Sequence, residues 1–127
     1  MLEQSYINIF TRAYIQVVLE NEEWPLGFIA DDWVSEPSDK FNKDTINKIK
    51  AECLDFINKN EDLLEQAKFE HARGASECAC DFWLTRNGHG AGFWCRQMGE
   101  LGDKLTKSAE SYGENNFYIE NDLIILL

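Results

Sequence analysis

The sequence has no long hydrophobic run. Nowhere in its 127 residues does an apolar stretch approach the roughly 20 residues that a helix needs to cross a bilayer. Its first residues, MLEQSYINIF, do not combine a basic stretch with a long apolar one, so we expect no secretory signal peptide. These two absences predict a protein that does not enter membranes and resides in the cytoplasm.

Positive charge is also scarce. Lys and Arg number 12 against 23 Asp and Glu, which gives a formal net charge of −11. Such a charge repels nucleic acids and anionic membranes, so direct binding to either is not expected. It can attract a basic protein surface, including one that normally holds DNA, although solubility alone would also explain it.

Common catalytic motifs are missing. The chain contains no Gly-x-Ser-x-Gly, Walker A or Gly-x-Gly-x-x-Gly pattern. Without an export signal, the four cysteines are expected to be reduced thiols. Cys78 and Cys80, with His71, His89 and Cys95, lack a recognised zinc spacing, so no metal is expected. His89 and Cys95 are the one candidate catalytic pair. Because no further group that would position them is evident, they do not predict an enzyme. No cofactor is implied.

Apolar residues recur at intervals of three and four in four segments. This spacing predicts amphipathic helices over residues 5–20, 44–59, 61–73 and 101–112. Asn42 or Asp44 can cap the second helix and Asn60 the third, whereas Gly74 and Gly113 suit helix ends.

The period changes to two near the segment DFWLTRNGHGAGFW, residues 81–94. Alternation around Phe82 predicts a strand, Asn87-Gly88 is a strong type I′ hairpin signal, and a return strand would end at Cys95. The last segment, NFYIENDLIILL, predicts two short strands about Asn121-Asp122. The expected fold is one α+β domain over residues 1–127, with N-terminal helices packed on a small antiparallel sheet in the order α-α-α-β-β-α-β-β.

Two surfaces are candidate binding sites. The first is a locally basic island around the predicted hairpin turn, where aromatic rings could stack on a nucleotide base; its candidate ligand contacts are Arg86, Asn87, His89 and Arg96. The alternative is that these cations only offset neighbouring acids. The second is the proline-broken segment WPLGFIADDWVSEPSDKF, whose candidate partner contacts are Asp31, Asp32, Trp33, Glu36 and Asp39. An aromatic ringed by charge is a common hot-spot arrangement.

The segment DFWLTRNGHGAGFW, with LGDKLTKSAESYGE and NFYIENDLI after it, resembles a family of small uncharacterised tailed-bacteriophage proteins with a DFWLTRNGHGAGFWD-type motif. The resemblance covers about residues 78–125. Cys95 stands where the family pattern suggests aspartate. The family has no established chemistry, so the resemblance implies an origin and no activity.

A phage origin favours a protein that binds and inhibits or redirects a host protein, as an anti-defence or host-takeover factor. Mimicry of DNA is one form that such binding could take. The partner would be a DNA-binding or nucleotide-dependent defence protein in the host cytoplasm. The alternative is a protein that binds or sequesters a nucleotide or small anion at the Arg86–His89 turn. A homodimer is compatible with either function.

Overall fold

The computed structural model describes residues 2–22, 24 and 36–127. It is mostly helical, with a small two-stranded antiparallel sheet, which agrees with the α+β class. The elements in chain order are α1 (Gln4–Asn21), η1 (Pro37–Lys40), α2 (Lys43–Lys59), α3 (Glu61–His71), α4 (Ala75–Arg86), η2 (Phe93–Cys95), α5 (Glu100–Glu110), β1 (Phe117–Glu120) and β2 (Leu123–Leu126).

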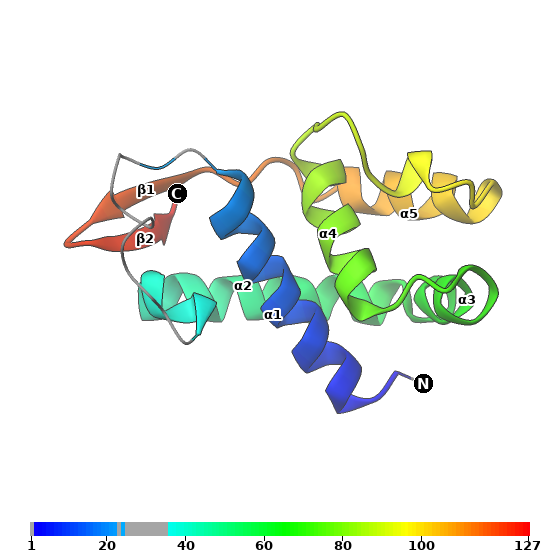
Figure 1. Cartoon of the computed structure of the whole chain (residues 1–127), viewed down its shortest axis with the longest axis horizontal. Coiled ribbons are helices and arrows are strands. Elements are labelled where there is room, and N and C mark those ends of the chain that lie inside the picture. The colour runs from blue at the N-terminus through cyan, green and yellow to red at the C-terminus, as the bar shows by residue number, and fades with distance from the viewer. Residues whose placement is uncertain (1, 23, 25–35) are drawn as a thin grey trace.

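The helices cross one another around one apolar core. In Figure 1, α2 runs along the long axis, α1 crosses it, and the hairpin of β1 and β2 lies at the end opposite α3. Helix α1 packs most extensively on α4 and then on α2. Phe56 and Phe82 stack at the centre, with ring centroids 4.0 Å apart. Among the described helices, none is both long and apolar enough to cross a membrane.

The four predicted helices are confirmed, with ends shifted by up to two residues. Asn42 caps α2, because its side chain accepts the N–H of Thr45 at 2.9 Å. Asn60 occupies the N-cap position of α3, but its side-chain amide donates to the carbonyl of Phe56 and to Ser108 Oγ instead of capping the helix. It therefore ties α2 to α5.

The C-terminal hairpin is also confirmed. Strands β1 and β2 pair antiparallel, with Glu120 opposite Leu123. Asn121 and Asp122 both have positive φ, 52° and 63°, as a type I′ turn requires. The hairpin docks on the start of α2, where the carbonyl of Ile124 accepts the N–H of Asn42 at 3.0 Å.

The predicted hairpin over residues 80–95 is wrong. Residues 75–86 form α4, and Asn87-Gly88 ends this helix instead of turning between strands. The N–H of His89 bonds the carbonyl of Leu84 at 3.0 Å, and that of Gly88 bonds the carbonyl of Thr85 at 3.2 Å. Gly88 has φ of 70°. These are the two bonds of a Schellman motif, in which glycine supplies the left-handed residue.

Helix α4 is buried on most sides, which explains why its sequence shows the alternation of a strand. Ala75, Ala79 and Phe82 follow helical spacing toward the core, but Asp81 and Trp83 are buried as well. A helix covered nearly all round has no polar face to mark a 3.6-residue period. The local alternation of apolar and polar residues then imitated a strand.

Gly74 also has a different role from the predicted one. Helix α3 ends at His71, and the next residue, Ala72, adopts the left-handed conformation at φ 54°. Gly74 lies at the N-cap of α4, and its N–H donates to Glu77 Oε1 at 2.9 Å.

Candidate functional site

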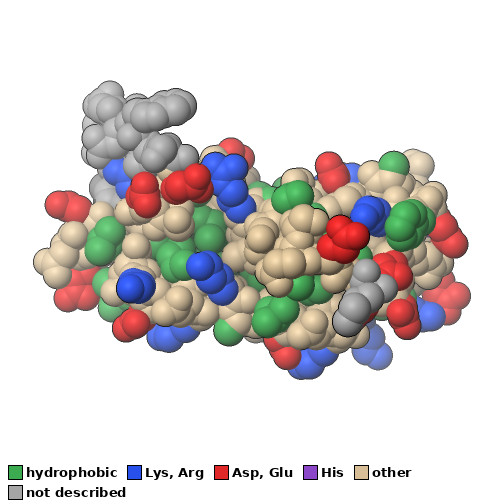
Figure 2. Space-filling view, turned by 90° about the horizontal axis from the view of Figure 1, so that it is seen from below, with side chains coloured by type: hydrophobic (Ala, Val, Ile, Leu, Met, Phe, Trp, Pro, Cys, Tyr) green, Lys and Arg blue, Asp and Glu red, His purple; other side chains and the backbone are tan. Residues whose placement is uncertain are grey.

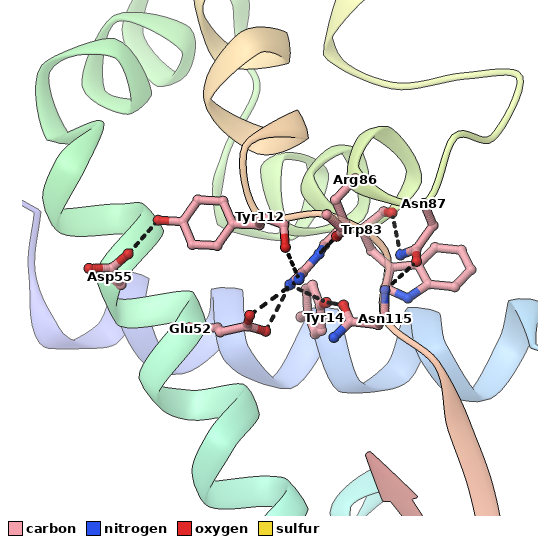
Figure 3. Close-up of polar contacts among 9 residues, drawn as sticks. Tyr14, Glu52, Asp55, Trp83, Arg86, Asn87, Tyr112 and Asn115 are labelled. Carbon is pink, nitrogen blue, oxygen red and sulfur yellow. Dashed lines mark hydrogen bonds and ion pairs between the residues drawn. The ribbon is translucent and has the colours of Figure 1, made fainter. Parts of the chain in front are cut away.

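A polar network surrounds Arg86 at the end of α4, as Figure 3 shows. Arg86 is in the last turn of α4 and only 5% exposed. Its Nη1 lies 2.8 Å from Glu52 Oε1 and its Nη2 lies 3.2 Å from Oε2, so the two side chains make a bidentate pair. Such a fork-on-carboxylate geometry is a particular strength of arginine.

The remaining donors of Arg86 reach the chain after α5. Nε donates to the carbonyl of Gly113 at 2.8 Å, and Nη2 donates to that of Tyr112 at 3.1 Å. Nη1 also donates to the hydroxyl of Tyr14 at 3.3 Å. Burial lowers the pKa of Arg86, but Glu52 and Tyr14 together outweigh this effect, so the pKa lies above its ordinary value. Arg86 therefore stays charged inside the protein.

Two neighbours extend this network. The Tyr14 hydroxyl donates to Asn115 Oδ1, and burial raises the pKa of Tyr14 far above its ordinary value. Asn87 Nδ2 donates to the carbonyl of Trp83 at 2.9 Å, while its Oδ1 accepts the N–H of Asn115 at 2.8 Å. The network thus joins α1, α2 and α4 to the segment that leads into β1.

The structure therefore separates the predicted ligand contacts. The expectation that Arg86 is an accessible cation at a turn is wrong, because it is buried and bonded on all sides. Arg96 is part of a second internal cluster, where it and Arg73 both pair with the fully buried Asp81, at 2.9 and 2.7 Å. The hydrogen bond and charge of Asp81 raise the pKa of Arg96, despite an opposing contribution from burial.

His89 is the predicted contact that faces outward. It follows Gly88 at the surface, and its ring lies 4.6 Å from that of Trp83. Trp83 is 1% exposed, so the histidine covers one side of a core aromatic. Trp94, the other tryptophan of this segment, is not buried: it is 52% exposed and lies on η2.

The thiol of Cys95, the candidate nucleophile, makes its hydrogen bonds within its own turn. Cys95 is exposed, and its thiol contacts the N–H and carbonyl of Gly92 at 3.4 and 3.3 Å. All four cysteines are free, and Cys53 and Cys78 are buried. No group of three or more metal-ligating side chains comes together among the residues that the structure describes.

The acidic partner segment is described in part. Asp31, Asp32 and Trp33 lie outside the described residues. Glu36 and Asp39 are exposed, and Glu36 Oε2 accepts from Arg12 Nε at 3.1 Å. This pair lies beside a groove of about 350 Å³ between α1, η1 and α2.

No family model, curated protein or solved structure matches the chain.

One surface feature was not anticipated from the sequence. Phe69, on the last turn of α3, is 75% exposed. Leu64 and Ala67 are the buried residues of this helix, and Phe69 falls off the stripe that they define. Its position between the charged residues Lys68 and Glu70 is the signal that could have marked it as a surface aromatic.

Proposed function

We propose that this protein acts by binding another protein, as an acidic anti-defence or host-takeover factor of a tailed bacteriophage, and that it carries out no reaction itself. The observation that carries the proposal is the internal use of its cations. Arg86 is committed to Glu52, and Arg73 and Arg96 are committed to Asp81. These pairs take up three cations and two carboxylates, which leaves 9 Lys and Arg against 21 Asp and Glu in the rest of the chain.

This charge distribution favours a basic partner surface over an anionic ligand. A nucleotide site at the predicted turn would need accessible cations, and two of the candidates are held in internal pairs. A basic groove that normally holds DNA is complementary to such a surface, and long-range attraction would speed the encounter. The proposed partner is a host DNA-binding or nucleotide-dependent defence protein in the cytoplasm.

We propose that the contact surface includes the acidic segment around Asp31, Asp32, Trp33, Glu36 and Asp39. Glu36 and Asp39 are exposed at its described end. Rim carboxylates would mainly raise the association rate, whereas an aromatic anchor would slow dissociation.

Affinity purification of the tagged protein from host cells, followed by kinetics with the recovered partner, tests the proposal. Reversing Asp31 and Asp32 to lysine should slow association and flatten its salt dependence. Trp33→Ala should speed dissociation. Recovery of no specific partner, or a partner whose binding is lost in His89→Ala and unchanged in the acidic-segment variants, would contradict the chosen surface and function.

A further inference from the structure

A second surface lies at the start of α1, on a different face from the groove beside Glu36. A cleft of about 430 Å³ is formed by the start of α1, the last turns of α3 and the start of α4. Leu2, Tyr6, Ile9 and Phe69 form its apolar wall. Phe69 is 75% exposed and Ile9 is 51% exposed. Large apolar side chains that are this exposed around one concavity are typical of a binding surface.

The rim of this cleft is acidic. Glu3, Glu65 and Glu77 line it, against one cation, Lys68. Figure 2 views the molecule from below and shows hydrophobic, acidic and some basic side chains together in its right-hand half, toward the end that holds α3 in Figure 1. An occupant of this cleft must therefore offer apolar surface together with positive charge.

The ring of Phe69 already has a cation of its own chain beside it. Lys68 Nζ lies 5.2 Å from the centroid of the Phe69 ring. A lysine or arginine of a partner could take the same place, because a cation is attracted to the electron-rich face of an aromatic ring. The acidic rim would favour the exchange by raising the local concentration of cations.

Self-association fits this cleft poorly. A second copy would bring another chain of net charge −11 against an acidic rim, and like charges across an interface cost free energy. An anionic ligand is disfavoured for the same reason. A cationic amphipathic segment complements both the apolar wall and the rim.

We propose that the cleft between α1, α3 and α4 binds a lysine- or arginine-rich amphipathic segment of a partner protein, with Phe69 as its anchor. This inference rests on the proposed protein-binding function and adds a site and a partner chemistry to it. The cleft is separate from the acidic segment at Glu36, which borders the groove between α1, η1 and α2.

The test measures binding of the full chain to a short amphipathic peptide of leucine and lysine by fluorescence anisotropy. Phe69→Ala should weaken binding about tenfold or more, as expected for an aromatic hot spot. Glu3→Gln should weaken binding by a smaller factor at low salt, and the difference should shrink as salt is added. The same peptide with glutamate in place of lysine should not bind.

Matched controls separate the cleft from general acidity. Trp94→Ala removes another half-exposed aromatic, and Glu110→Gln removes an exposed carboxylate on α5; both should bind the peptide as wild type does. Equal affinities for Phe69→Ala and Trp94→Ala would overturn the proposal. So would binding of the glutamate peptide, or a dimer in sedimentation that Phe69→Ala dissociates.

Failure of the cleft as a binding site and failure of the proposed protein-binding function would give different results. A partner that is recovered from host cells equally by wild type and Phe69→Ala would refute the cleft and leave the function standing. Peptide binding that depends on Phe69, with no host partner recovered by wild type, would support the cleft and refute the function.

Discussion

The guanidinium of Arg86 lies 2.8 Å from the carboxylate of Glu52, and the arginine side chain is almost completely buried while the glutamate is about one-third exposed. This asymmetry decides what each substitution should cost. Removing the arginine leaves a carboxylate and the carbonyls of Tyr112 and Gly113 without their donor. Removing the glutamate charge leaves a cation that still has those carbonyls.

We expect Arg86→Met to lower the free energy of unfolding by about 3–5 kcal/mol, the usual cost of breaking a buried pair. Glu52→Gln should cost less, about 2–3 kcal/mol. It leaves a buried cation without its counter-charge, but the amide can still accept a hydrogen bond and the two carbonyls keep their donor. Urea denaturation of both variants measures the difference. A larger loss for Glu52→Gln than for Arg86→Met would contradict the assigned asymmetry.

The two tryptophans of the motif should respond differently to truncation. Trp83 is 1% exposed and Trp94 is 52% exposed. Trp83→Ala should cost about 3–5 kcal/mol, as expected for loss of a core aromatic. Trp94→Ala should change stability by about 0.5 kcal/mol or less. Thermal melting compares them, and equal melting temperatures would show that Trp83 is not a core residue.

Gly92 should resist substitution for reasons of space. A Cβ at this position would lie 2.2 Å from Thr85 Oγ1, whereas a Cβ at Gly90 would meet nothing within 4 Å. Thr85 Oγ1 also accepts the N–H of Phe93 at 3.2 Å, so it cannot move away without breaking that bond. Gly92→Ala should cost about 1–3 kcal/mol, a typical overpacking penalty. Gly90→Ala is the control, and a Gly92→Ala protein as stable as this control would be the contrary result.

The thiols should react in an order that follows their burial. Burial raises the pKa of Cys78 to about 12 and that of Cys53 higher still. A raised thiol pKa lowers the thiolate fraction at neutral pH, and the thiolate is the reactive form. Iodoacetamide near pH 8 should therefore label the exposed Cys95 first, and Cys53 and Cys78 only after unfolding. Peptide mass spectrometry gives the order; early labelling of Cys78 in folded protein would be inconsistent with it.

The sequence predicted the fold wherever a single local signal was sufficient. The stripe of α2 is amphipathic, and its cap at Asn42 is a local interaction, so the boundaries agree to within one residue. Asn121-Asp122 likewise gave the turn between β1 and β2. The periodicity of α4 misleads because two of its charged residues face inward. Asp81 is buried between Arg73 and Arg96, and Arg86 pairs with Glu52 of α2.

The candidate site was harder to predict for the same reason. A basic island in the sequence indicated accessible cations, but whether a cation is accessible depends on its partners. Arg86 and Glu52 are 34 positions apart, and no local pattern links them. Phe69 is the reverse case, since its place between Lys68 and Glu70 is visible in the sequence, but only the structure shows that it is 75% exposed.

The docking of the C-terminal hairpin on α2 has a consequence for the order of folding during synthesis. The Ile124 carbonyl accepts the N–H of Asn42, and the N–H of Leu126 donates to Thr45 Oγ1 at 3.0 Å. Ile124 and Leu126 are translated about eighty residues after Asn42 and Thr45, the residues to which they bond. The start of α2 therefore cannot complete its native hydrogen bonds while β2 is still inside the ribosome. Until then, Phe41 lacks its β-bridge to Ile124. A nascent chain stalled before β2 should therefore expose the apolar side chain of Phe41 to chaperones.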